Sequence, residues 1–408
     1  MSDRFAPTDA AQVLEVVASA AAAETPLEVV GAGSKRALGR PVQTNHRLEL
    51  SGLSGIELYE PAELVMTARP GTTMAAIEAE LQGHGQQLAF EPPDLGPLLG
   101  GAPADNTIGG TIGGAIACNL AGPRRPKAGA ARDHFLGVEA VTGRGEAIKA
   151  GGRVVKNVTG YDLCKLFAGS YGTLAVMTSV TVKVMPAPEK TRTVLVADLN
   201  DHDAGRAMTT ALTSPHEVSA AAHLPAAVAA RSGVSYVSGA GGAVTALRVE
   251  GPAPSAEHRC RALRELLSGC GDIEELHGHN SGALWCEVGN VTPFTGQPDR
   301  VVWRLSVPPT AGATVAASIL ANADGDVFYD WGGGLVWLSL VDDHGATVRA
   351  AVAETGGHAT LVVADTARRD ALAVFEPQEP GLAALSARIK DSFDPRRILN
   401  PGRMYPGV

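Results

Sequence analysis

The segment from Val29 to Arg36 reads Val-Val-Gly-Ala-Gly-Ser-Lys-Arg, a composition typical of a phosphate-binding loop. Its two valines predict a strand that enters a tight turn at Gly31 to Gly33, where backbone N–H groups can donate to phosphate oxygens. The spacing matches neither common phosphate loop. The dinucleotide fingerprint G-x-G-x-x-G requires glycine where Arg36 stands, and the Walker lysine spacing is absent from this segment. The loop therefore predicts an anion site without identifying the ligand.

Four later segments have the composition of backbone that closely approaches a flat, extended ligand. Arg69-Pro70-Gly71 follows a predicted strand, and Gly109 to Gly114 contains two glycine pairs. Lys156 to Leu163 leads into Gly169-Ser170-Tyr171-Gly172-Thr173-Leu174, and Asn400-Pro401-Gly402-Arg403 lies near the C-terminus. Any one of these glycines is equally typical of an ordinary turn. The order of these segments along the chain is more specific than any one of them.

In that order, these segments resemble the FAD-binding domain of the p-cresol methylhydroxylase and vanillyl-alcohol oxidase superfamily. The resemblance covers residues 1 to about 188 and the last 15 residues. Over nearly the whole chain, the sequence is more narrowly similar to the FAD-binding E-subunit family of bacterial glycolate oxidases. This resemblance implies an α+β fold, with a two-part p-cresol methylhydroxylase-type FAD-binding domain and a smaller mixed α/β cap domain.

The resemblance also implies that FAD is the cofactor and which residues contact it. Many relatives attach flavin covalently through a histidine in the first glycine turn, whereas Ser34 and Lys35 stand there in this chain, so we expect non-covalent FAD. Tyr171 replaces the acidic residue usual in the segment Gly-Ser-Glu-Gly. The implied cofactor-binding residues are Gly31, Ala32, Gly33, Ser34, Lys35, Arg36, Pro70, Gly71, Gly109, Gly110, Thr111, Gly113, Gly114, Asn157, Gly172, Val176, Asn400 and Arg403.

Oxidation of a 2-hydroxy acid requires a hydride acceptor, a base for the hydroxyl proton and a cation for the carboxylate. Relatives that oxidise D-lactate or glycolate carry a Gly-Asp-Gly-Asn-x-His run that this chain lacks; Asp324-Gly325-Asp326 has no histidine after it. Arg304 is the candidate catalytic cation, with a structural salt bridge as the alternative. His277 and His279 are more typical of an exposed loop.

Two functions remain open. In the first, the chain is the FAD-binding subunit of a glycolate oxidase complex that oxidises glycolate to glyoxylate. A homologous larger flavin subunit and an iron–sulfur subunit would then carry electrons onward. In the second, it is a self-sufficient FAD-dependent D-2-hydroxy acid (D-lactate) dehydrogenase. The absent histidine run favours the first. The five cysteines include no C-x-x-C pair, so we expect neither an iron–sulfur cluster nor another metal in this chain.

Hydrophobic periodicity and turn residues place these segments on secondary structure. Pro186 and Pro188 interrupt the pattern and mark the main boundary. We predict an FAD-binding domain over 1–188, a cap domain over 189–375 with a small mixed sheet and helices on one face, and a C-terminal segment over 376–408 that returns to the first domain. The predicted helices cover residues 10–23, 73–81, 256–267, 311–320 and 382–393, and the predicted strands cover 27–30, 64–68, 135–141, 146–149, 173–184, 194–197, 301–306 and 335–340.

Composition limits the class of partner. A net charge of −9 and a pI near 5.7 argue against nucleic-acid binding. We expect no transmembrane helix and no export signal, hence a cytoplasmic protein whose complex is at most peripheral on the inner membrane. One short run is basic, Arg124-Arg125-Pro126-Lys127. It is typical of a solvated loop, with a polyanion or partner contact as the alternative.

Overall fold

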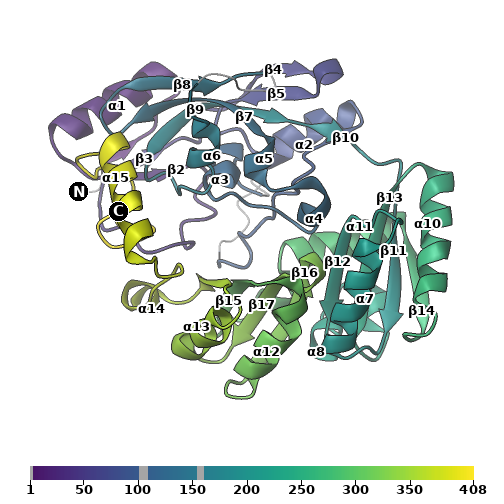
Figure 1. Cartoon of the computed structure of the whole chain (residues 1–408). Coiled ribbons are helices and arrows are strands. Elements are labelled where there is room, and N and C mark those ends of the chain that lie inside the picture. The colour runs from purple at the N-terminus through teal and green to yellow at the C-terminus, as the bar shows by residue number, and fades with distance from the viewer. Residues whose placement is uncertain (1–2, 101–108, 154–159) are drawn as a thin grey trace. The chain divides into compact units, whose positions relative to one another are not determined.

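A computed structural model describes residues 3–100, 109–153 and 160–408, which form two compact units. Unit 1 comprises Met1–Ala121, Gly129–Ala187 and Arg369–Val408, and unit 2 comprises Gly122–Ala128 and Pro188–Arg368. Figure 1 shows both ends of the chain in unit 1. These ranges differ from the predicted domains in two places: the chain returns to unit 1 at Arg369, and the segment 122–128 belongs to unit 2.

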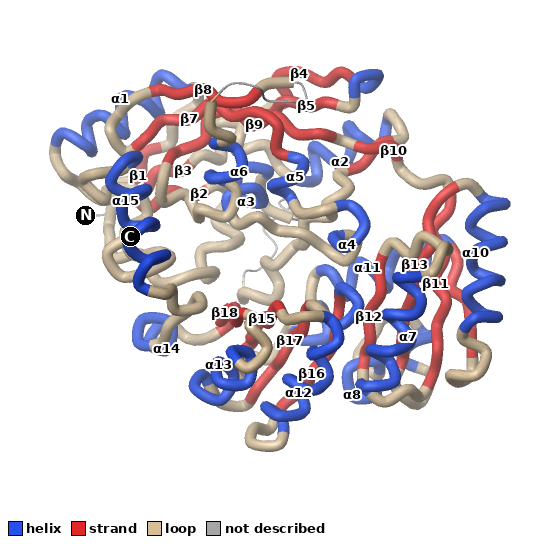
Figure 2. The backbone as a smooth tube through the Cα atoms, viewed as in Figure 1, coloured by secondary structure: helices blue, strands red, loops and turns tan. Residues whose placement is uncertain are grey.

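Unit 1 is built on a five-stranded antiparallel sheet in the order β4-β5-β9-β7-β8. A parallel three-stranded sheet, β1-β3-β2, and the pair β10-β6 complete its strands (Figure 2). The strands are β1 Arg4–Phe5, β2 Glu28–Val30, β3 Arg47–Glu49, β4 Ile56–Glu60, β5 Val65–Ala68, β6 Gln86–Gln87, β7 Phe135–Thr142, β8 Ala147–Gly151, β9 Ala175–Lys183 and β10 Met185–Pro186. The helices are α1 Ala10–Ala22, α2 Met74–Gly83, α3 Ile112–Ala117, α5 Ala131–His134, α6 Leu163–Phe167 and α15 Pro380–Phe393.

Strand β9 is buried along almost its whole length because both faces of the sheet are covered. Ala175 and Met177 pack with apolar residues of α2, α3 and α6 in one core cluster. Val176, between them, packs with Val13 and Val17 of α1 in a second cluster. This alternation follows from the two-residue period of a strand. The same strand therefore holds the glycine-rich segments on one side and α1 on the other.

Unit 2 is an eight-stranded sheet in the order β14-β11-β13-β12-β16-β17-β15-β18, and every pairing in it is antiparallel. Its strands are β11 Lys190–Ala197, β12 Ala220–Leu224, β13 Val244–Gly251, β14 Ile273–His277, β15 Val301–Ser306, β16 Gly325–Asp330, β17 Leu335–Leu340 and β18 His358–Val363. Its longer helices are α7 Asp201–Thr213, α10 Ala253–Leu266, α11 Gly278–Gly289, α12 Gly312–Leu320 and α13 Gly345–Ala353; the four-residue α4, Arg125–Ala128, also belongs to it.

Two details of unit 2 differ from the expectation of a small mixed sheet with helices on one face. The sheet is antiparallel throughout because each helical connection skips one strand: β11-α7-β12, β13-α10-β14, β15-α12-β16 and β17-α13-β18 each join two strands that have an antiparallel strand between them. Helices also cover both faces. Arg192 of β11 pairs with Glu257 of α10 at 2.7 Å, whereas the next residue, Thr193, accepts from Trp285 Nε1 of α11 at 2.8 Å. Successive strand residues point to opposite faces, so α10 and α11 lie on opposite sides.

The predicted elements are otherwise confirmed, since each overlaps an observed helix or strand of the same type. Their ends follow local chemistry. Asp9 caps α1 by accepting from the Gln12 N–H at 2.9 Å, and Thr73 caps α2 in the same way. Within the described residues, no helix is both long enough and apolar enough to cross a membrane.

A buried ion pair in α15 anchors the C-terminal segment within unit 1. Lys390 is fully buried and donates from Nζ to Thr173 O at 2.6 Å, Asp394 Oδ2 at 2.8 Å and Leu399 O at 3.0 Å. The Asp394 carboxylate also accepts the N–H groups of Ile398 and Leu399 at 3.0 and 2.8 Å. All three ammonium hydrogens are therefore used. The pair joins α15 to the start of β9 and to the last turn of the chain.

We predict that Lys390→Met lowers the free energy of unfolding by about 3 kcal/mol, because it leaves Asp394 and two carbonyl oxygens buried without their donor. Urea denaturation followed by circular dichroism measures this change. Lys149→Met is the control, since the Lys149–Glu139 pair is exposed and its loss costs at most about 1 kcal/mol. Equal midpoints for the two variants would contradict the assignment.

Candidate cofactor-binding site

The loop that follows β2 forms one wall of a cavity in unit 1. Gly33 has φ of +81°, which permits the chain to reverse, and the turn closes with hydrogen bonds from Arg36 N to Gly33 O and from Leu38 N to Lys35 O. Within the described residues, no internal hydrogen bond engages the backbone N–H groups of Ala32, Gly33, Ser34 and Lys35. Four successive donors therefore remain available at the cavity wall.

Most of the predicted cofactor residues line this cavity. Gly71, Gly109 and Gly110 do not, and Asn157 lies outside the described residues. The predicted residues in the lining are Gly31, Ala32, Gly33, Ser34, Lys35, Arg36, Pro70, Thr111, Gly113, Gly114, Gly172, Val176, Asn400 and Arg403. Lining residues outside the prediction are Val29, Val30, Leu50, Ala117, Cys118, Tyr171, Ala175 and Met177. The aliphatic members of this set come from β2, α3 and β9 and from Leu50, which follows β3, and the hydrophobic pattern of these segments indicates a core instead of a cavity wall.

Several glycines are required by packing around the cavity. A Cβ on Gly31 would collide with the Thr111 hydroxyl, and a Cβ on Gly71 would collide with Leu50 O. A Cβ on Gly113 would lie 2.6 Å from Pro70 Cβ. The two glycine-rich segments and the Pro70 turn are thus packed too closely for a side chain at Gly31 or Gly113. Gly71 does not line the cavity, but it packs closely against Leu50, which does.

The two basic side chains of the loop have partners inside the protein. Lys35 donates to Gly109 O at 3.0 Å and to Ser34 Oγ at 3.3 Å, and burial lowers the pKa of its ammonium group. Arg36 donates twice to the Glu28 carboxylate, at 2.8 Å from both Nε and Nη2. Lys35 therefore joins the loop to the Gly109 segment, and Arg36 fixes the loop on β2.

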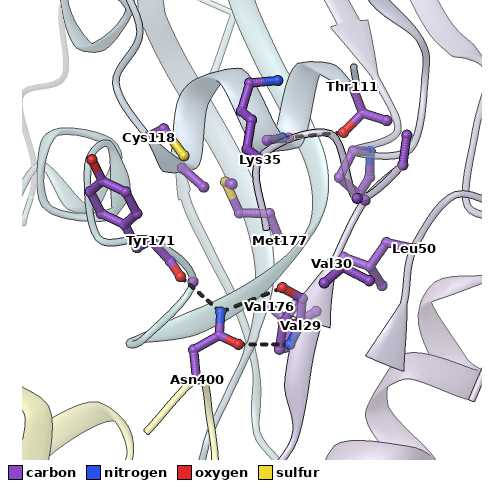
Figure 3. A pocket seen from close by; sticks show the side chains of 18 of the residues that line it. Val29, Val30, Lys35, Leu50, Thr111, Cys118, Tyr171, Val176, Met177 and Asn400 are labelled. Atoms are coloured by element: carbon purple, nitrogen blue, oxygen red, sulfur yellow. Dashed lines mark hydrogen bonds between the residues drawn. The ribbon is translucent and has the colours of Figure 1, made fainter. Parts of the chain in front are cut away.

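The C-terminal residues hold the loop from the other side (Figure 3). Asn400 Oδ1 accepts the Val29 N–H at 2.8 Å, while Nδ2 donates to Tyr171 O at 2.8 Å. Arg403 donates to the backbone oxygens of Lys35 and Arg36 at 3.1 and 2.9 Å. Both side chains thus bind backbone groups of the cavity wall, which makes them positioning residues.

Arg369, which the sequence did not predict, holds the backbone that directly follows the loop and does not itself line the cavity. It is buried and donates to Ala37 O at 2.7 Å and to Gly39 O at 3.1 Å. It lies in α14, Thr366–Ala371, next to a second arginine in the chain, Arg368, which pairs with aspartates. No local pattern distinguishes the two, because their difference is a difference in burial.

Tyr171 occupies the position where the family turn has an acidic residue. Its φ is +54°, an uncommon value for a residue with a side chain. Its ring lies edge-on to Phe375, with centroids 5.0 Å apart, and Phe375 in turn lies 6.0 Å from Tyr405. The backbone oxygen of Tyr171 is the acceptor for Asn400. This position therefore contributes its backbone to the turn and an aromatic ring to the cavity.

Arg304 lies in unit 2, on β15, with its guanidinium carbon 5.0 Å from the ring centroid of Trp331. The two candidate histidines near the start of α11 are not brought into a comparable cluster. His277 is 62% exposed and lies 3.2 Å from Glu275, its neighbour on β14. Of the sequence-predicted catalytic candidates, Arg304 alone is placed against an aromatic side chain.

This chain is similar to a known protein family and to a protein of that kind over nearly its whole length. A family model described as FAD binding domain matches residues 4–111 and 108–151. Glycolate oxidase subunit GlcE of Escherichia coli (strain K12) is 35% identical over 394 residues, which cover 96% of this chain and 96% of that protein. The chain belongs to the GlcE family of glycolate oxidase subunits.

One further relative and one solved structure of similar fold are also informative. Glycolate oxidase subunit GlcD of Bacillus subtilis (strain 168) is 31% identical over 192 residues, 47% of this chain and 38% of that protein. The crystal structure of p-cresol methylhydroxylase with substrate bound has a TM-score of 0.73 at 15% identity, covering 99% of this chain and 88% of that chain. The predicted E-subunit resemblance and the p-cresol methylhydroxylase-type fold are both confirmed.

The cavity of this GlcE-family chain fits a dinucleotide flavin. FAD carries a pyrophosphate, for which the four backbone N–H groups of residues 32–35 are suitable donors. The remaining wall, from Val30 and Leu50 to Ala175 and Met177, is largely apolar, as the ring systems of FAD require. The donor set and the apolar lining therefore agree with the FAD-binding family model.

Glu28 of β2, the partner of Arg36, contributes to stability in a way that depends on pH. Burial opposes ionisation, but hydrogen bonds and charge from Arg36 and Arg47 lower the pKa of this carboxyl below its ordinary value. A carboxylate with a lowered pKa stabilises the fold above the unfolded pKa, about 4.3, and loses that contribution as pH falls through the folded pKa.

We predict that Glu28→Gln lowers the free energy of unfolding by about 1–2 kcal/mol at pH 7. The difference between wild type and variant should shrink as pH falls below about 4. Urea titrations at pH values from about 7 to 3 measure it, with Glu63→Gln, an exposed carboxylate, as control. A difference that is constant over this range would contradict the ion-pair origin of the effect.

Proposed function

We propose that this chain is the FAD-binding subunit of a glycolate oxidase complex that oxidises a small 2-hydroxy acid, glycolate, to glyoxylate and passes electrons to partner subunits. The cavity wall of free backbone donors at residues 32–35 carries this proposal, on a chain that aligns with GlcE over 96% of its length. When bound, FAD supplies the hydride acceptor.

The protein would contribute three things. The backbone of residues 31–35 would bind the pyrophosphate, and the clamp by Asn400 and Arg403 would keep that backbone in place. The Pro70 turn and the close-packed Gly113 and Gly114 would allow the flavin to approach the chain. Arg304 would supply the cation for the substrate carboxylate, since a guanidinium matches a carboxylate in charge and geometry.

We propose that FAD is held without a covalent bond. The described residues that line the cavity include no histidine, and the turn that carries one in many relatives has Ser34 and Lys35 here. Cys118 is the thiol in the wall, and burial raises its pKa, which keeps it protonated and weakly nucleophilic at neutral pH. Reversible binding is then the expected mode.

We predict that acid denaturation releases all of the flavin into the supernatant, and that added FAD then protects Cys118 of the refolded protein from alkylation at mildly alkaline pH. Mass spectrometry of peptides measures both results. Cys270 and Cys286 are exposed and serve as internal controls that FAD leaves unprotected.

Flavin retained on a denatured peptide would contradict non-covalent binding. Equal labelling of Cys118 with and without FAD would contradict the location of the site. The two results are independent, because a chain could hold FAD reversibly in another place.

The partners follow from the family. A larger flavin subunit related to GlcD, with which this chain aligns over 192 residues, would be the homologous partner. An iron–sulfur subunit would receive the electrons. We further propose a cytoplasmic complex, associated with the inner membrane at its periphery if its electron acceptor lies there.

One experiment distinguishes this proposal from the alternative, a self-sufficient D-lactate dehydrogenase. Purified chain loaded with FAD is mixed without oxygen with glycolate, and separately with D-lactate, and its visible flavin absorbance is followed. We predict that neither substrate bleaches the flavin of the chain alone. Rapid bleaching by D-lactate would support the alternative, and bleaching by glycolate only with the larger flavin subunit present would support the complex.

A further inference from the structure

Trp331 in unit 2 occupies an unusual backbone conformation. Its φ is +53°, and Gly332 and Gly333 follow with φ of +68° and +95°, so three successive residues are left-handed. Such values are rare for a bulky residue and persist only where surrounding contacts impose them. Two contacts do so here: Asp330 Oδ1 accepts the Trp331 N–H at 2.7 Å, and Trp331 Nε1 donates to Gly122 O at 3.0 Å.

The segment 122–128 supplies that second contact and is itself built into unit 2. Arg124 donates to both carboxylate oxygens of Glu250, at 2.9 and 2.7 Å, and both side chains are about 10% exposed. Burial opposes ionisation of Glu250, yet Arg248 and Arg124 lower its pKa to about 2. Arg124 therefore anchors the segment, which fixes the position of the next residue, Arg125.

Arg125 and Arg304 both lie against the ring of Trp331. Their guanidinium carbons are 4.3 and 5.0 Å from its centroid, and both side chains are partly exposed. On the sheet, Arg304 pairs with Trp337 of β17 and with Thr360 of β18, which point to the same face. Two cations from distant parts of the chain thus meet at one indole, beside a hydroxyl and a second aromatic ring.

This arrangement matches the recognition of a small carboxylate. Both guanidinium groups lie at the same indole ring, and the positive charge of each attracts a carboxylate. The guanidinium fork donates hydrogen bonds in the geometry that a carboxylate accepts. The indole gives both side chains a fixed support through cation–π contact, so less rotamer freedom is lost when the anion binds.

We propose that Arg125 acts with Arg304 as a second specificity-determining residue, and that the pair on Trp331 binds the carboxylate of the hydroxy acid. This inference rests on the proposed function. It adds a residue from the basic run 124–127, in which Arg124 is structural and Arg125 is the ligand-binding member. The run is therefore neither a solvated loop nor a polyanion site in this assignment.

The test is isothermal titration of the FAD-loaded full-length chain with oxalate, a carboxylate of similar size that hydroxy-acid chemistry cannot oxidise, and with oxamide as its uncharged counterpart. We expect oxalate to bind and oxamide not to bind. Arg125→Gln and Arg304→Gln should each weaken oxalate at least about tenfold, the loss typical of one charged hydrogen-bond partner. Arg125→Lys keeps the charge without the fork and should show a smaller loss.

Lys127→Gln is the matched control, because Lys127 is an exposed cation of the same segment that pairs only loosely with Glu217, at 3.4 Å. It should bind oxalate as the wild type does. Flavin absorbance, recorded on every sample, tests the proposed function separately: a wild-type chain that holds no FAD would overturn that function. Oxalate affinity unchanged in Arg125→Gln, or absent from an FAD-loaded wild-type chain, would overturn the role of Arg125.

Discussion

The carboxamide of Asn400 is the interaction on which the cofactor cavity depends. It bonds to Val29 as a neighbouring strand would, accepting from its N–H at 2.8 Å, and it donates to the Tyr171 carbonyl at 2.8 Å. Asn400 N also donates to Leu27 O, and Leu27 N donates to Ile398 O. The end of the chain thereby extends the edge of the small parallel sheet at β2. One amide side chain fixes two turns that are about 140 residues apart in the sequence.

Charged side chains around the cavity mainly stabilise its backbone. Arg36 is paired with Glu28, Arg369 and Arg403 donate to carbonyl oxygens of residues 35–39, and Lys390 holds the C-terminal turn through Asp394. In the described part of the chain, the backbone N–H groups of residues 32–35 have no internal acceptor and are available to an anionic ligand. Such donors are fixed in direction and need no side-chain ordering when the ligand binds, which lowers the entropic cost of association. We therefore propose that the loop binds its ligand through its backbone conformation, which the arginines maintain.

Unit 2 uses arginine in two ways within a few residues. Arg124 is buried against Glu250 and orders the segment 122–128, whereas Arg125 lies on the ring of Trp331 with Arg304. The left-handed turn at Trp331 is stabilised from both sides, by Asp330 and by Gly122. A strained backbone that is held by several independent contacts is a common feature of ligand sites. The basic run is thus divided between a structural and a ligand-binding role.

Much of this organisation is determined by local sequence. Alternating valines in 173–184 and the caps at Asp9 and Thr73 specify β9, α1 and α2, because propensity and periodicity act over a few residues. The glycine turns identify the loop that could bind phosphate. The antiparallel order of the eight-stranded sheet could not be read in this way, since strand pairing joins distant segments. The same limit applies to single side chains: Arg369 and Arg368 are neighbours with equal chemistry, and only burial distinguishes them. Tertiary structure decided that Asn400 and Arg403 bind backbone and that Arg125 lies on the ring of Trp331, because each of these contacts closes a loop of more than a hundred residues.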